Sequence, residues 1–312
     1  MHTDSSLRGS KALIVIPGTV SYFYNSEGRR IAEALRNLGG EADVTLLQAA
    51  PPQDYDWCFF LNLWEIIYST GDEPGAFAQI ERIKARCKRT ALVLLECVQM
   101  KWFGDSFALF QRAELDTFID IGFHNQKADT PLEAQPTYHF IFNGLTEQER
   151  AAAPRAFTPE TERPIPWAFV GHITPIRLDF LQDLLEKLDR RGFVYMVPFG
   201  AVTETGPDLN EDQFNQVLAR TQYQIWCSHH PFFYIESLRF RMALLAGALP
   251  IKVDFTPFPG NSLFTYLIYG RDNFADGVRG LDFEATRQRF LSDFCAQPSL
   301  EAGLLKFLRE VG

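Results

Sequence analysis

Short apolar runs alternate with longer amphipathic segments along the chain, and this alternation constrains the fold more than any other feature. The runs are rich in β-branched and aromatic residues, which predicts strands at 11–18, 43–47, 57–64, 90–98, 117–124, 138–144, 167–172, 193–200, 222–230 and 249–254. Apolar residues at helical spacing predict helices at 25–40, 75–88, 177–192, 210–221, 237–246, 283–296 and 299–311. The alternation favours an α/β fold with parallel sheets and helices on both faces.

Polar residues mark the starts of several of these helices. Asn25 or Ser26 can cap the first helix, which two glycines end at 39–40. Asn210 can cap the helix over 210–221 in the same way.

The length of the chain predicts two domains. It has 312 residues, and domains commonly have roughly 100–200. The segment 145–166 is polar, carries four prolines and loses its periodicity after Ala153, so we interpret it as the link between domains. We expect an N-terminal domain over 1–155, a C-terminal domain over 156–290, and a last helix within 291–312 that can pack back on the first domain.

Composition excludes several classes of protein. Hydrophobic residues make up 46%, which argues against disorder, and the net charge of −9 makes nucleic acid a less favoured partner. Five cysteines without C-x-x-C spacing favour buried thiols in a reducing cytoplasm. The N-terminus is polar and no apolar run reaches 18 residues, so we expect a cytoplasmic protein without a membrane span. No phosphate loop, G-x-G-x-x-G or H-E-x-x-H motif is present, and "DYD" at 54–56 precedes a strand rather than following one.

Two strand-to-helix turns in the second half have the residues of a phosphate site. In parallel α/β sheets ligands bind beyond the carboxyl ends of the strands, where helix N-termini offer N–H groups to an anion. In "FVGHITPIR" the strand stops at Gly171 and Arg177 starts the next helix. In "IESLRFR" Ser237 can cap a helix whose first turn carries Arg239, where a cation is unfavourable unless an anion binds.

Each turn also has a plain structural interpretation, a tight turn with a surface arginine or a helix with mixed surface charge. Together, the two turns could hold a diphosphate from two sides.

His229 and His230 end the strand between the two turns. Adjacent strand residues point to opposite faces, so a metal shared by the two is disfavoured. His229 is a candidate contact for a diphosphate or a sugar, and a loop histidine without a role is the alternative.

The segment "SLRFRMALLAGALPIKVD" resembles the nucleotide-sugar-binding segment of GT-B glycosyltransferases, above all the exostosin-like and spore-maturation-type branch. The pattern of that branch, roughly S-x-R-x-x-E-A-L-x-x-G-x-x-P-(V/I), is matched by Ser237, Arg239, Ala243, Leu244, Gly247 and Pro250. "IFNGLT" is similar to the N-G turn before the interdomain link, and "FVGHITPIR" to the first loop of the C-terminal domain. The resemblance covers about residues 138–255 in detail. It implies a GT-B fold, with two Rossmann-like doubly wound domains facing a cleft.

The resemblance also implies a donor site and a reaction. The expected donor is a nucleoside-diphosphate sugar, with UDP-sugar preferred, bound by Gly171, His172, Arg177, His229, Glu236, Ser237 and Arg239 without a metal or another cofactor. The family has a glutamate for the ribose where this chain has Met242, which is a poor hydrogen-bond acceptor. Either Glu236 takes that role, or the donor is held differently, or the protein has lost turnover.

The first domain is expected to bind the acceptor. Tyr22, Tyr24, Trp64 and Trp102 are candidate stacking surfaces for a sugar or a base, although most aromatics of this chain belong to the core. An inverting transferase needs a general base near the acceptor hydroxyl. The candidates, each of which follows an apolar run, are Glu65, Glu96 and His124.

We therefore expect a glycosyltransferase that moves a sugar from a nucleotide sugar to a small-molecule, glycan or nucleobase acceptor. A non-catalytic nucleotide-sugar-binding protein and a phage-type nucleobase glycosyltransferase are the alternatives.

Overall fold

The computed structural model describes residues 7–18, 22–95, 101–124, 137–197, 209–228, 232–258, 260 and 262–311. Of these, residues 22, 101, 102, 123, 124 and 156 are described in their backbone only. The described residues fall into two compact units. Unit 1 lies within Met1–Phe123, Lys127–Thr146 and Pro298–Gly312, and unit 2 lies within His124–Gln126 and Glu147–Gln297.

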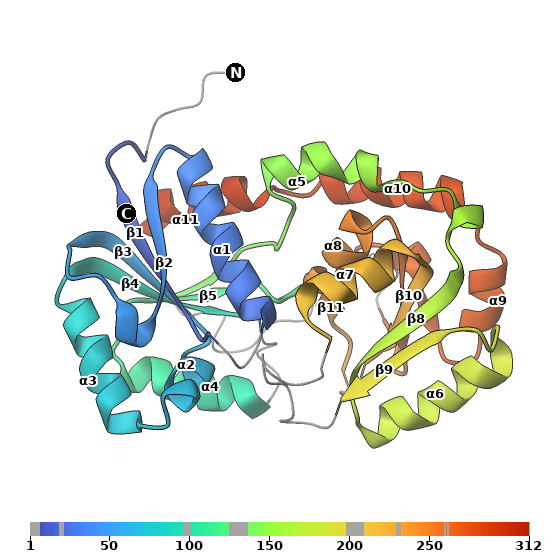
Figure 1. Cartoon of the computed structure of the whole chain (residues 1–312), viewed down its shortest axis with the longest axis horizontal. Coiled ribbons are helices and arrows are strands. Elements are labelled where there is room, and N and C mark those ends of the chain that lie inside the picture. Colours follow the sequence, from blue (N-terminus) through green and yellow to red (C-terminus); the bar gives the residue numbers. More distant parts are fainter. Residues whose placement is uncertain are drawn as a thin grey trace. The chain divides into compact units, whose positions relative to one another are not determined.

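Unit 1 is a six-stranded parallel sheet between two helical layers (Figure 1). Its strands, in the order β2-β1-β3-β4-β5-β7, are β1 (Lys11–Ile16), β2 (Glu41–Leu46), β3 (Tyr55–Leu61), β4 (Cys87–Leu94), β5 (Thr117–Asp120) and β7 (Tyr138–Phe140). One face carries α1 (Tyr22–Asn37) and α11 (Leu300–Val311). The other carries η1 (Leu47–Ala49), α2 (Leu63–Thr70), α3 (Glu73–Lys84) and α4 (Lys101–Arg112).

Unit 2 is a five-stranded parallel sheet, also covered on both faces. Its strands, in the order β13-β12-β10-β8-β9, are β8 (Ile165–His172), β9 (Phe193–Val197), β10 (Thr221–Cys227), β12 (Leu249–Asp254) and β13 (Ile268–Gly270). One face carries α6 (Pro175–Lys187) and α9 (Phe274–Arg279), and the other α7 (Glu211–Ala219), α8 (Ser237–Leu245) and α10 (Phe283–Cys295). The remaining elements are β6 (Phe123–His124), α5 (Glu147–Ala152), η2 (Ala153–Ala156), η3 (Glu160–Glu162), β11 (Ile235–Glu236) and η4 (Thr265–Leu267).

Both sheets have the same winding. In each sheet, the first strand along the chain lies between the second and the third. The chain therefore adds the second strand on one side of the first strand and the third strand on its other side. Such a reversal opens a crevice at the carboxyl ends of the two central strands, which is the usual ligand position in open α/β sheets. The crevice lies between β1 and β3 in unit 1, and between β8 and β10 in unit 2.

The predicted fold class, α/β with two doubly wound parallel sheets, is confirmed. Several predicted details are wrong. The strand predicted over 57–64 ends at Leu61, because Asn62 takes a left-handed backbone and starts α2. The first helix already includes Tyr22, and the side chain of Asn25 accepts from the Gly18 amide at 3.0 Å instead of capping that helix. Ser237 is the first residue of α8 rather than its cap.

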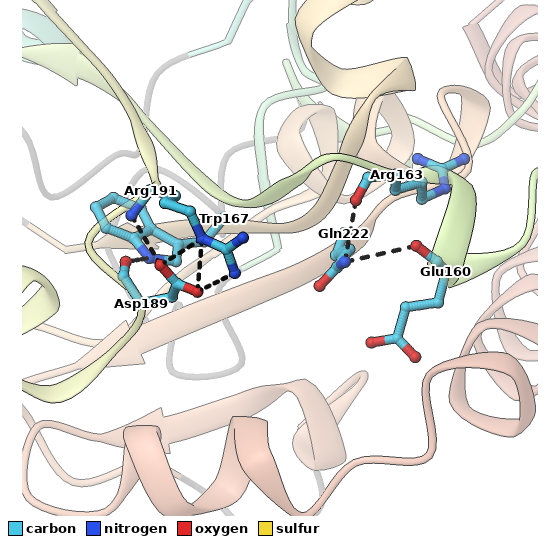
Figure 2. Close-up of polar contacts among 6 residues, drawn as sticks. All are labelled: Glu160, Arg163, Trp167, Asp189, Arg191 and Gln222. Carbon is cyan, nitrogen blue, oxygen red and sulfur yellow. Dashed lines mark hydrogen bonds and ion pairs between the residues drawn. The ribbon is translucent and has the colours of Figure 1, made fainter.

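Polar groups at the amino edge of the unit 2 sheet bond within the protein (Figure 2). The indole of Trp167 on β8 donates to the carbonyl of Asp189 at 2.6 Å, which ties the segment after α6 to the sheet. The Gln222 side chain on β10 donates to the carbonyls of Arg163 at 3.0 Å and Glu160 at 3.5 Å. The two hydrogen bonds of Gln222 therefore fix residues 160–163 to the start of β10.

Candidate functional site

Arg177 lies at the carboxyl end of β8, one of the two strands beside the crevice of unit 2. Thr174 caps α6 by accepting from the Arg177 amide at 3.3 Å, so Arg177 occupies the first turn of the helix. Its side chain turns back to the end of β8, where Nη1 donates to the carbonyl of His172 at 3.3 Å. A Cβ at Gly171 would lie 3.0 Å from that Nη1, so a glycine makes room for the guanidinium.

Arg239 reaches the same strand end from the opposite helical layer. It lies in the first turn of α8, and its Nη1 donates to the carbonyl of Val170 at 3.2 Å. Its Nε donates to Oε1 of Glu236 at 3.1 Å, which makes an ion pair. The guanidinium also lies 5.9 Å from the centre of the Trp226 ring. The two arginines thus converge on the carboxyl end of β8, and one of them is already paired.

The charges of this site do not balance. Arg177 is only 3% exposed, and among the described residues no carboxylate pairs with it. Burial lowers the pKa of Arg177, and the nearby charge of Arg239 lowers it further, while Glu236 acts in the opposite direction. A buried and uncompensated charge is costly, on the order of several kcal/mol. The arrangement therefore favours a bound anion.

One carboxylate oxygen of Glu236 is buried without a hydrogen bond among the described residues. Glu236 is 9% exposed, and its Oε2 has no hydrogen-bond partner within the part of the chain that is described. It precedes α8 without capping it through the side chain. An ionised carboxylate only accepts hydrogen bonds, so a ligand hydroxyl is a chemical match for this oxygen.

Tyr234 and Cys227 are buried near the same charged groups. Burial raises the pKa of Cys227 to about 12, and the charges of Arg177 and Arg239 oppose that rise. Burial also raises the pKa of Tyr234, with the charge of Glu236 as the next contribution. Both groups are therefore neutral near pH 7, and the local charge comes from the arginines and Glu236.

A buried ion pair supports the segment that carries Glu236. Lys252 and Asp254, two residues apart on β12, pair with both side chains fully buried. The Lys252 ammonium lies 4.7 Å from the ring centre of Phe233 and 4.8 Å from that of Tyr234. It therefore holds the chain just before Glu236 against the edge of the sheet.

The other residues predicted to bind the donor differ in their position relative to the two arginines. Ser237 is buried at the start of α8, beside Glu236. His172 ends β8 and offers its carbonyl to Arg177. His229 lies outside the described residues. Met242, half-buried on α8, stands where the resembling family has its ribose glutamate.

In unit 1, one predicted base candidate has a described side chain. Glu65 lies in the first turn of α2 and is buried, with its amide donating to the Asn62 side chain at 3.4 Å. Glu96 lies outside the described residues, and so does the side chain of His124, whose backbone belongs to β6.

The predicted stacking aromatics of unit 1 differ in exposure. Tyr24 is fully buried on α1, whereas Trp64 on α2 is exposed. The side chains of Tyr22 and Trp102 lie outside the description.

Within the described ranges, no three His, Cys, Asp or Glu side chains gather in a way that could hold a metal ion. Among the described helices, none combines the length and the apolar character that crossing a bilayer requires.

The sequence matches no family model and no curated protein. Solved structures are similar to this chain to different degrees. One is an α-glucosyltransferase in complex with UDP and a 13-mer DNA containing an HMU base, at a TM-score of 0.67 and 9% identity, covering 97% of this chain and 99% of that chain. More distant are an α1,3-fucosyltransferase at a TM-score of 0.44 and 11% identity, and the same enzyme type with GDP at 0.42 and 12%, each covering 90% of this chain and 81% of the other.

At these identities the likeness establishes the fold, which is GT-B with two Rossmann-like units. The likeness to the first structure extends over nearly the whole of both chains. Membership of the exostosin-like branch stays a prediction.

Proposed function

We propose that the chain is a glycosyltransferase whose unit 2 binds a nucleoside-diphosphate sugar in the crevice between β8 and β10. Arg177 carries this proposal, because its buried guanidinium has no carboxylate partner among the described residues. A diphosphate supplies the missing negative charge and has enough oxygens for both Arg177 and Arg239. Arginine binds phosphate through charge-assisted hydrogen bonds, each contributing roughly 1.5–3 kcal/mol.

The same residues have chemical roles in the transfer. As the bond from the sugar to the diphosphate breaks, negative charge develops on the departing oxygen. Guanidinium groups and the α6 N-terminus, fixed in advance, stabilise that charge. Glu236 accepts a hydrogen bond from a donor hydroxyl through Oε2, in place of the glutamate that the family has at position 242. This chemistry requires no metal ion.

The acceptor is proposed to bind unit 1. Glu65, Glu96 and His124 remain the candidates for the base that deprotonates the acceptor hydroxyl in an inverting reaction. Of these, Glu65 has the support of its place: it is buried in the first turn of α2, directly after β3 and beside the β1/β3 crevice.

Calorimetric titration with UDP, GDP and ADP tests donor binding, and incubation with the matching nucleotide sugars tests turnover. We expect micromolar or tighter binding of one diphosphate, UDP by preference, and its release from the sugar donor when a suitable acceptor is present. Binding of the diphosphate without breakdown of any donor, across several acceptors, would support the non-catalytic binding protein instead. If none of the three nucleotides binds, the proposal is wrong.

A nucleobase acceptor is the second candidate, favoured by one observation. The structure that matches over 97% of this chain was solved with UDP and DNA containing an HMU base. Transfer of a radiolabelled sugar to hydroxymethylated duplex DNA, with plain DNA of the same sequence as the control, tests it. Labelling of the modified duplex alone supports a nucleobase acceptor, and labelling of neither duplex rejects it.

A further inference from the structure

Two exposed aromatic rings lie in parallel at the carboxyl edge of the unit 1 sheet. Trp64 and Tyr68, one turn apart on α2, have ring centres 5.2 Å apart and planes within 5° of each other. Trp64 is 45% exposed and Tyr68 is 66% exposed. Large apolar rings rarely lie this open beside each other unless they contact a partner.

The core of unit 1 does not require these rings. The opposite side of α2 buries Leu63, Ile66 and Ile67 against the sheet, which accounts for the packing of the helix. Trp64 and Tyr68 point the other way and belong to neither core cluster of unit 1. Their exposure thus has no structural purpose in the described part of the unit.

The rings stand beside the β1/β3 crevice because of the backbone at Asn62. This residue follows β3 directly and has a φ of 54°, a left-handed conformation that is unfavourable for most residues. It allows α2 to begin at Leu63 without an intervening loop. The strain therefore holds the first turn of the helix, with Trp64 and buried Glu65, at the edge of the sheet where ligands of this fold type bind.

We propose that Trp64 and Tyr68 form a stacking platform for a nucleobase of the acceptor, an inference that rests on the proposed transferase function. A flat base extends a column of two parallel rings, and such stacking strengthens binding by about 10- to 100-fold per base. The sequence of α2, "LWEIIYST", has no lysine or arginine, so the helix recognises a ring rather than a phosphate. Stacking of this kind accommodates an acidic protein, because it does not depend on phosphate contacts.

The test is binding of a short fluorescein-labelled oligothymidine to the full-length protein with UDP present, measured by anisotropy. Trp64→Ala should weaken binding by about 10- to 100-fold, Tyr68→Ala by less, and Trp64→Phe by at most about threefold. An abasic strand of equal length, which keeps the phosphates but lacks the rings, should bind weakly and equally to wild type and Trp64→Ala. Affinity for the oligothymidine should change little with salt, because phosphates contribute little.

Leu178→Ala is the matched control, since Leu178 is 49% exposed but lies on α6 of unit 2. It should bind the oligothymidine as wild type does. Equal affinity of wild type and Trp64→Ala overturns the proposal, as does an abasic strand that binds as well as oligothymidine. Binding of maltoheptaose instead of oligothymidine also overturns it. UDP affinity, measured separately on each variant, should equal that of wild type. If wild type itself does not bind UDP, the proposed donor site in unit 2 is wrong, and the stacking platform is not refuted by that result.

Discussion

At the scale of single residues, the two carboxylate oxygens of Glu236 differ in their surroundings. Its Oε1 accepts from Arg239, while its Oε2 has no partner among the described residues. A diphosphate that binds Arg239 displaces part of that ion pair, whereas a hydroxyl that donates to Oε2 gains a bond. The carboxylate therefore disfavours a bare anion and favours a ligand that also carries a hydroxyl.

Glu236→Gln should separate these effects. Removing the negative charge releases Arg239, so inorganic pyrophosphate should bind about two- to tenfold tighter. UDP should not gain in the same way, because its ribose hydroxyl meets a weaker acceptor, and the preference for UDP over pyrophosphate should fall about tenfold. Titration of both ligands into both proteins measures this. If the two affinities change by the same factor, the hydroxyl contact does not exist.

The residues that the sequence identified are those with a local signature. Arg177 and Arg239 each stand in a first helical turn next to a strand end, a pattern visible without any coordinates. The Lys252–Asp254 pair was not predicted as part of the site. The sequence signal for this pair was a lysine inside an otherwise apolar strand. The aromatic rings that contact this lysine belong to Phe233 and Tyr234, which lie close to it only in the folded chain.

At the scale of elements, one buried arginine joins three parts of unit 2. Arg163 donates to the carbonyl of Leu218 at 3.3 Å in the last turn of α7, to that of Thr221 at 2.8 Å, and to that of Ala246 at 3.0 Å after α8. Carbonyls at helix ends lack partners within the helix, and a cation is favourable there. Burial lowers the pKa of Arg163 to about 10, so it is still charged near pH 7.

Arg163→Met should lower the free energy of unfolding by about 2–4 kcal/mol, because several buried carbonyls lose their donor at once. Arg191→Met is the control, since Arg191 is exposed and, within the described ranges, pairs only with neighbouring Asp189. It should change the stability by less than about 0.5 kcal/mol. Urea unfolding followed by circular dichroism measures both. Equal stability of the two variants would show that Arg163 does not join these elements.

The C-terminal helix α11 packs on a histidine. The ring of His139 on β7 lies edge-on to Phe307 with 5.0 Å between centres, and its Nε2 has no hydrogen-bond partner in the described structure. Burial lowers the pKa of His139, and Glu310 partly opposes this. Below the ordinary histidine pKa the unfolded chain therefore takes up a proton that the folded chain resists, and stability falls as the pH drops.

His139→Phe should remove this contribution. Between about pH 7 and pH 5, wild type should lose more stability than the variant, and above pH 7 the two curves should run parallel. Thermal unfolding at a series of pH values tests this. The same pH dependence in both proteins would mean that His139 is protonated in the folded state.

Elements with clear periodicity and end signals were predictable. Asn210 caps α7 through a full capping box, and the last two helices occupy nearly their predicted ranges. The error at 57–64 has a physical reason. The apolar run continues across Asn62, but its left-handed backbone divides the run into β3 and α2, and no periodicity signals that change. The short helices α5 and α9 were missed because six residues give too little pattern.

At the scale of the whole molecule, the same winding occurs twice and each crevice carries a different chemistry. Unit 2 places cationic groups and one carboxylate at its crevice, which suits a nucleotide diphosphate. Unit 1 places the buried carboxyl group of Glu65 and the exposed rings of Trp64 and Tyr68 beside the β1/β3 crevice. Alternation of strands and helices predicted two parallel sheets, although it missed β13 of unit 2. The ligand chemistry depends on how side chains meet at the edges, which the sequence indicated only in part.

The most direct test of the central claim is calorimetric titration of UDP into wild type, Arg177→Met, Arg239→Ala and the double variant. Each single substitution should weaken UDP binding by about 10- to 100-fold, and the losses should not be additive, because both guanidinium groups hold one diphosphate. Arg177→Met should keep or raise the stability of the ligand-free protein, since it removes an uncompensated buried charge. UDP binding that is equal in wild type and Arg177→Met would contradict the account.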